Sequence, residues 1–242
     1  MLQAALWGGI AGSSLFIGAL LGIYKDIPKK ISAFVMALGT GVLIGAATFE
    51  LLTNAVNEGG ILFPSLGFLL GAIMFTVAEI IITKKGGNER KRSTMNPKNH
   101  SGMAIFIGTI IDAIPESLII GVSLLENHSI SWLIVIAIFI SNFPEGLSSS
   151  IGLKNDGYSK KKILFLWSVV LILSAVSSLI GYALIGPSSE IVQTMIGAFA
   201  AGGILAMVSS TMMPEAFEEG GPMVGLLSAG GLLCSLILTY YG

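Results

Sequence analysis

The sequence predicts an all-α polytopic membrane protein with eight transmembrane helices, and three observations support this fold class. First, 53% of the 242 residues are hydrophobic and only 11% are charged, with a mean hydropathy of +0.86, as in multi-span membrane proteins. Second, the apolar residues form eight runs, each long enough to cross about 30 Å of hydrocarbon as a helix. Third, all 13 lysine and arginine residues lie between these runs. We therefore expect residues 1–242 to form a single transmembrane domain.

The predicted spans follow the apolar runs along the chain. They cover residues 2–24, 32–54, 61–82, 102–125, 130–153, 163–186, 190–213 and 222–241. The first run has no basic segment before it and no small-residue cleavage site after it, which indicates a retained span rather than a signal peptide. The single cysteine, Cys234, lies in the last run. It cannot form an internal disulfide, and we expect it to be a small buried hydrophobic side chain.

The basic residues indicate how the chain is oriented in the membrane. They lie in residues 25–30, 84–98 and 154–162, which are alternate connections between the spans. The positive-inside rule places these connections in the cytoplasm, so we expect a multi-pass cell-membrane protein with both termini extracytoplasmic. The connection after the seventh span carries Glu218 and Glu219 instead, but acidic residues contribute little to orientation. We interpret the loop at about 84–100 as an orientation signal rather than a site for nucleic acid or anionic lipid.

Acidic residues interrupt the fourth and fifth apolar runs in two similar boxes, residues 111–118 (IDAIPESL) and 140–147 (ISNFPEGL). Each intramembrane carboxylate costs about 2.5 to 3.5 kcal/mol, so Asp112, Glu116 and Glu145 together oppose insertion by about 8 to 10 kcal/mol. Each proline also leaves the carbonyl four residues earlier without its helical partner. Acidic side chains and freed carbonyls are suitable ligands for a cation.

The spacing within the boxes places oxygen atoms on shared helix faces. Asp112 and Glu116 are four residues apart, as are Ser141 and Glu145, and Asn142 borders the second face. No lysine, arginine or histidine lies in any predicted span, so this negative charge needs protons or cations. The alternative is that the prolines are structural kinks whose protonated glutamates bond to a neighbouring helix. Two repeated, centred boxes with a third acid favour the cation site.

Three further acids are candidate pathway residues. Glu50 lies in the outer part of the second span. Its side chain could equally line a pathway or extend to the membrane interface. Glu79 and Glu215 lie near the ends of their spans. This position favours side chains that extend to the membrane interface over side chains that line a pathway.

Two internal matches indicate inverted repeats. The two boxes lie 29 positions apart on consecutive spans, which run in opposite directions through the bilayer. In addition, residues 36–60 align without a gap with residues 197–221. The shared positions are Ala37/Ala198, Gly41/Gly202, Ala55/Ala216, Glu58/Glu219, Gly59/Gly220 and Gly60/Gly221. We therefore predict a 3+2+3 arrangement, in which spans one to three and six to eight are inverted copies. Such repeats with a midplane site are typical of alternating-access transporters.

These boxes resemble those of the ZIP family of divalent-metal transporters, which have eight spans in a three-two-three order and external termini. The family's fourth span often carries His-Asn-Phe-Pro-Glu-Gly. Here residues 141–146, in the fifth span, keep all but the first position, and the fourth span keeps Pro115 and Glu116. The resemblance implies that Glu116 and Glu145 bridge two metals and that Asn142 is a ligand of the second metal.

This chain departs from the family pattern at three positions. Asp112 replaces the family's histidine, Ala113 the following asparagine, and Ser141 the ligand that opens the fifth-span box. The sixth span also has no acid between residues 163 and 186. We therefore expect one metal bound by Asp112, Glu116, Ser141 and Glu145, with Asn142 nearby.

The function implied by the resemblance is uptake of a divalent metal into the cytoplasm. Zinc is the first candidate by resemblance, while an all-oxygen ligand set also suits manganese, magnesium or iron. We expect the divalent metal to be the cargo and the lipid bilayer to surround the protein. We expect no prosthetic group and no nucleic-acid partner. A homodimer is compatible with the sequence. A cation/proton exchanger is the alternative.

The sequence does not favour an intramembrane enzyme. Hydrolysis by a pair of aspartates needs a second intramembrane aspartate, and a zinc protease needs an HExxH-type helix. An enzyme that acts on lipid phosphates needs intramembrane arginine or lysine to hold the phosphate. The predicted spans contain none of these.

Overall fold

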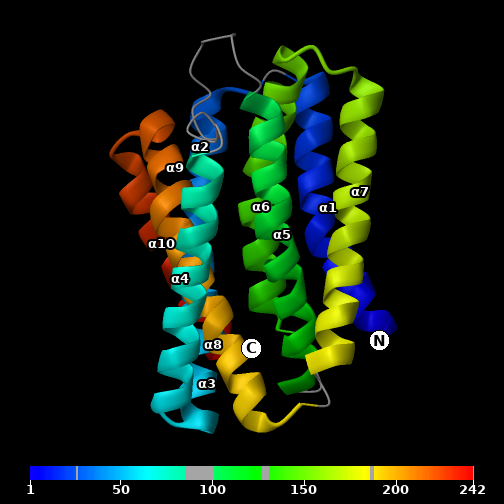
Figure 1. Ribbon diagram of the computed structural model, residues 1–242. Helices are drawn as coiled ribbons and strands as arrows, with labels where there is room; N and C mark the ends of the chain where they lie inside the picture. Colours follow the sequence, from blue (N-terminus) through cyan, green and yellow to red (C-terminus); the bar gives the residue numbers. More distant parts are fainter. Residues whose placement is uncertain (26, 85–100, 127–130, 186–187, 242) are drawn as a thin grey trace.

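The computed structural model describes residues 1–25, 27–84, 101–126, 131–185 and 188–241, without the side chains of residues 82–84, 101–105, 111–112 and 125–126. Over these residues the chain is helical and has no strand. Eight stretches are long and apolar enough to cross a membrane (Figure 1). The all-α, eight-span prediction is therefore confirmed for the described part of the chain.

The helices follow the apolar runs closely. The bounds are α1 Leu2–Tyr24, α2 Lys29–Gly45, α3 Thr53–Gly59, α4 Leu62–Lys84, α5 Ser101–Glu126, α6 Trp132–Asn155, α7 Lys160–Ile180, α8 Glu190–Met207, α9 Met213–Gly220 and α10 Met223–Tyr241. π-helical segments join α2 to α3 (Ala46–Leu52) and α8 to α9 (Val208–Met212), and a third, Gly181–Ile185, follows α7.

The second and seventh spans are longer than predicted. They run over Lys29–Gly59 and Glu190–Gly220, because α3 and α9 continue them beyond the π-helical segments. Pro214, the residue after the predicted end of the seventh span, lies in the first turn of α9. The π-helical segment before it already departs from the i−4 bonding pattern, and a proline is tolerated in a first helical turn.

The spans form two groups of helices. In Figure 1, α5, α6, α1 and α7 lie on one side, and within this group α1 packs against α6 and α7, and α5 against the same two helices. In the second group α2 packs against α10 and α4 against α8. The two groups contact each other mainly where α2 lies along α6. The boundary between the groups therefore passes beside α5 and α6, the helices that carry the two acidic boxes.

Two of the basic connections lie at one end of the bundle. The α1–α2 and α6–α7 connections are at the top of Figure 1, as is the C-terminal end of α4, and both chain termini lie toward the bottom. This arrangement is required by eight spans that alternate in direction.

Cys234 is exposed, so its predicted burial is wrong. The buried residues of α10 are Val224, Ser228, Gly231 and Ser235, which recur every three or four positions. Cys234 lies beside this stripe, and α10 has a single buried face because it packs at the edge of the bundle.

Candidate metal site

The two prolines of the acidic boxes lie inside α5 and α6. Around them, glycines let each helix approach a neighbour closely. A Cβ atom on Gly121 of α5 would overlap the carbonyl oxygen of Ser178 on α7. A Cβ atom on Gly146 of α6 would overlap the carbonyl oxygen of Leu15 on α1 in the same way. These contacts define which face of α5 meets α7 and which face of α6 meets α1.

Both glutamates lie on the other faces of their helices. Glu116 is two residues, roughly 200° of helix rotation, from Leu118, whose carbonyl meets Gly181 after α7. Glu145 has the same relation to Phe143, whose carbonyl meets Gly18 of α1. Glu116 is 3% exposed and Glu145 is partly buried. Since α5 and α6 pack against each other, the glutamates turn away from the outer helices α7 and α1.

Ser141 and Asn142 are buried beside Glu145 on α6. The Ser141 hydroxyl donates a hydrogen bond to the Ile138 carbonyl at 3.1 Å, which leaves its lone pairs available as acceptors. The backbone of Ser141 lies against Gly39 of α2. Ser141 therefore lies where the two helix groups meet.

The complete predicted ligand set is not tested by the described residues. The side chain of Asp112 is outside the described part of the chain. Within that part, histidine, cysteine, aspartate and glutamate form no group of three or more that could hold a metal. The arrangement of Asp112, Glu116 and Glu145 around one ion remains a prediction.

Glu116 also borders a cavity of about 170 Å³ between α4, α5 and α8. Its other walls are mainly apolar and include Met74, Phe199 and Ile204. A carboxylate at the edge of an apolar cavity is poorly solvated, which favours a bound cation or proton.

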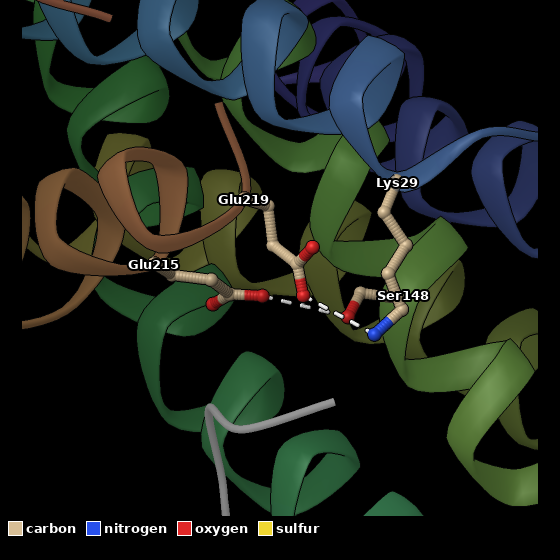
Figure 2. Close-up of polar contacts among 4 residues, drawn as sticks. All are labelled: Lys29, Ser148, Glu215 and Glu219. Atoms are coloured by element: carbon tan, nitrogen blue, oxygen red, sulfur yellow. Dashed lines mark hydrogen bonds and ion pairs between the residues drawn. The ribbon is translucent and has the colours of Figure 1, made fainter. Parts of the chain in front are cut away.

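The predicted pathway residues Glu50 and Glu215 each accept a hydrogen bond from a serine, the first from Ser131, which caps α6, and the second from Ser148 within α6. Glu50 accepts from the Ser131 hydroxyl at 3.3 Å. Glu215, on α9, accepts from Ser148 at 3.5 Å, as Figure 2 shows. Ser148 follows Glu145 by three residues and shares its helix face. Glu215 therefore lies about one helical turn beyond Glu145, toward the end of the bundle where the α1–α2 and α6–α7 connections lie.

An ion pair lies beside Glu215. Lys29, in the first turn of α2, forms a 3.2 Å ion pair with Glu219 of α9 (Figure 2). Neither this ion pair nor the contacts of the two serines were predicted from the sequence. The spacing of Ser148 from Glu145 was the one available signal for a polar neighbour. Glu79, the third pathway candidate, is partly buried on α4.

Comparison with known proteins identifies several relatives. A protein of Arabidopsis thaliana named "putative zinc transporter" is 24% identical over 209 residues, covering 85% of this chain and 33% of that protein. Large-conductance mechanosensitive channels of Alkaliphilus oremlandii and Hathewaya histolytica are 42% and 36% identical over 52 and 75 residues. The channel matches cover 22% and 31% of this chain, and 38% and 53% of the channels. The chain thus spans between a third and about half of these curated relatives.

The family comparison covers more of the chain than either channel match. The model of the ZIP zinc transporter family matches residues 84–239, which include both acidic boxes. Because this match covers well over half of the sequence, the chain belongs to the ZIP zinc transporter family.

Proposed function

We propose that this protein transports a divalent metal across a membrane, with zinc as the first candidate and iron or manganese as further cargo. The observation that carries the proposal is Glu116, which is 3% exposed inside a membrane span of a ZIP family member. A carboxylate there costs about 2.5 to 3.5 kcal/mol, and binding a cation would offset that cost. The family assignment also fits the prediction that the chain is not an enzyme.

The proposed site holds one metal between α5 and α6. Asp112, Glu116, Ser141 and Glu145 are the proposed ligands, with Asn142 next to them. The burial of Glu116, Ser141 and Asn142, and the turn of both glutamates away from the outer helices, support this set. An all-oxygen site would bind zinc less tightly than a nitrogen or sulfur site, which suits a cargo that must be released.

The proposed route runs along α6 toward the cytoplasm. Glu50 contacts the start of α6 through Ser131, and Glu215 contacts it through Ser148, one turn beyond Glu145. Metal would pass from the Glu50 end through the site to Glu215, and we keep Glu79 as a further pathway candidate. The positive-inside rule supports this direction, because two of the basic connections lie at the Glu215 end of the bundle.

The helix bounds support the proposal that the flanking triplets are inverted copies. Helix α8 begins at Glu190, which is 161 residues after the start of α2 at Lys29. Helix α10 begins at Met223, which is also 161 residues after the start of α4 at Leu62. The glycines after α3 and α9, Gly60 and Gly221, have the same spacing and positive φ values of 70° and 67°. The packing also corresponds, since α2 pairs with α10 and α8 with α4.

If the flanking triplets are inverted copies, the two positions equivalent to Lys29 and Glu219 should also lie close together. Their counterparts at the opposite end are Glu190 and Glu58. Gly59 lies against Thr194 on α8, as Gly220 lies against Ala33 on α2, so the two helix ends are packed alike. In a Cys234→Ser background, a short bismaleimide is expected to cross-link Lys29→Cys with Glu219→Cys and Glu58→Cys with Glu190→Cys.

The matched control for this experiment is Lys29→Cys with Glu58→Cys. These positions lie at opposite ends of the second span, so the reagent should not join them. Efficient cross-linking of positions 29 and 219 without cross-linking of 58 and 190 would contradict the inverted-repeat proposal.

The proposed function is tested with the purified protein in proteoliposomes. Zinc should accumulate in the vesicles well above the level in protein-free vesicles, and the accumulation of iron and of manganese is measured in the same way. A pH dye inside the vesicles separates the two transport mechanisms, because an exchanger would raise the internal pH as metal enters and a simple permease would not. Equal accumulation with and without protein, for all three metals, would overturn the proposal.

A further inference from the structure

Two lysines contact the last turn of α1, and a third lysine directly follows that turn in the chain. The Nζ atom of Lys154, at the end of α6, donates to the Ile23 carbonyl at 3.4 Å. The Nζ atom of Lys160, at the start of α7, lies 4.6 Å from the centre of the Tyr24 ring. Lys25 is the next residue of the chain, and all three lysines are exposed. We call Lys25, Lys154 and Lys160 the lysine corner.

The charge around the lysine corner is strongly positive. Lys161 and Lys162 follow Lys160 directly, and the Nζ atom of Lys162 lies 4.5 Å from the centre of the Tyr158 ring. The α6–α7 connection contains one acid, Asp156, and Asp26 lies outside the described residues. The contacts of Lys154 and Lys160 are to a neutral carbonyl and an aromatic face, which orient an ammonium group without cancelling its charge.

The position of the lysine corner in the bundle determines what can reach it. It lies where the spans of α1, α6 and α7 end, so it is at the depth of the membrane interface. Tyrosine rings are typical of that depth, and lysine binds phosphate as a compact point charge. The phosphates of phospholipids occupy the same depth. At the same end, Lys29 of the second helix group is instead paired with Glu219.

From this arrangement we propose that the lysine corner binds the phosphate of an anionic phospholipid. The site would lie at the end of α6, the helix that carries Glu145. It is separate from the proposed metal site, and the proposal does not depend on metal transport.

Native mass spectrometry of the full chain in detergent, with phosphatidylglycerol or phosphatidylcholine added, tests this proposal. Phosphatidylglycerol is expected to bind more tightly than phosphatidylcholine. Each lysine near an anionic surface contributes about 1 kcal/mol, and 1.4 kcal/mol is a factor of ten. The double variant Lys154→Gln/Lys160→Gln should therefore bind phosphatidylglycerol about 25-fold more weakly.

Two control variants distinguish a specific site from a general effect of positive charge. The variant Lys29→Gln/Lys30→Gln removes two lysines from the same end and should keep wild-type binding, and Lys154→Arg/Lys160→Arg should keep most of it. Equal losses in the two glutamine variants would overturn the proposal, as would equal binding of the two lipids by the wild type. Inorganic phosphate should not displace the lipid at millimolar concentration, and displacement would assign the site to free phosphate instead.

Discussion

Replacing Glu116 or Glu145 with glutamine is expected to lower zinc uptake into proteoliposomes at least about 100-fold. Glutamine keeps the size of the side chain but removes the charge that would bind the metal. Even residues that only support a metal ligand typically change affinity or activity 10- to 100-fold when mutated, so a charged ligand should matter at least as much.

The same substitutions should not destabilise the protein. A neutral amide costs less to insert than an intramembrane carboxylate, and Glu116 is 3% exposed within its span. The thermal unfolding midpoint in detergent should therefore be unchanged or higher. Lost transport with retained stability distinguishes a metal ligand from a glutamate that joins two helices, because loss of a structural bond would lower both quantities.

Glu190→Gln is the matched control, because Glu190 is an exposed glutamate at the first position of α8. It should transport zinc like the wild type. Added zinc should also stabilise the wild type, by about 2.7 kcal/mol at a concentration 100 times the dissociation constant, and should stabilise neither site variant. Wild-type uptake by both Glu116→Gln and Glu145→Gln would remove these residues from the proposed site.

The number of spans was predictable because the bilayer imposes a minimum length on each apolar run. The ends of the second and seventh spans were not, because the hydropathy pattern does not reveal π-helical segments. After Ala46–Leu52 the helix continues through residues such as Asn57 and Glu58, which are polar and exposed. Their polarity is typical of a loop, whereas the structure has α3 there.

The site could be predicted only within each helix. The spacing of Ser141 and Glu145 determines their shared face in any α-helix. The contacts of Glu50 with Ser131 and of Glu215 with Ser148 join residues from different spans. Such contacts depend on how far helices are shifted along one another, and helical periodicity carries no information about that shift.

Gly121→Ala is expected to destabilise the protein by about 2 to 3 kcal/mol, because overpacking of this size is typical when the neighbour cannot move aside. The added Cβ atom would overlap the carbonyl oxygen of Ser178 and crowd the backbone nitrogen of Tyr182. Both are backbone atoms of the sixth span, in α7 and in the π-helical segment that follows it, so α5 itself has to move away from α7. The measurement is the loss of folded, monodisperse protein on heating in detergent.

Gly230→Ala is the matched control for Gly121→Ala. Gly230 lies in α10, and a Cβ atom there would have no neighbour within 4 Å. Alanine is also the better helix former by up to about 1 kcal/mol, so this variant should be as stable as the wild type or slightly more stable. A movement of α5 would shift Glu116, five residues before Gly121, so Gly121→Ala should lower zinc uptake even where the protein stays folded. Equal stability and equal uptake in the two alanine variants would show that the close approach of α5 and α7 does not position Glu116.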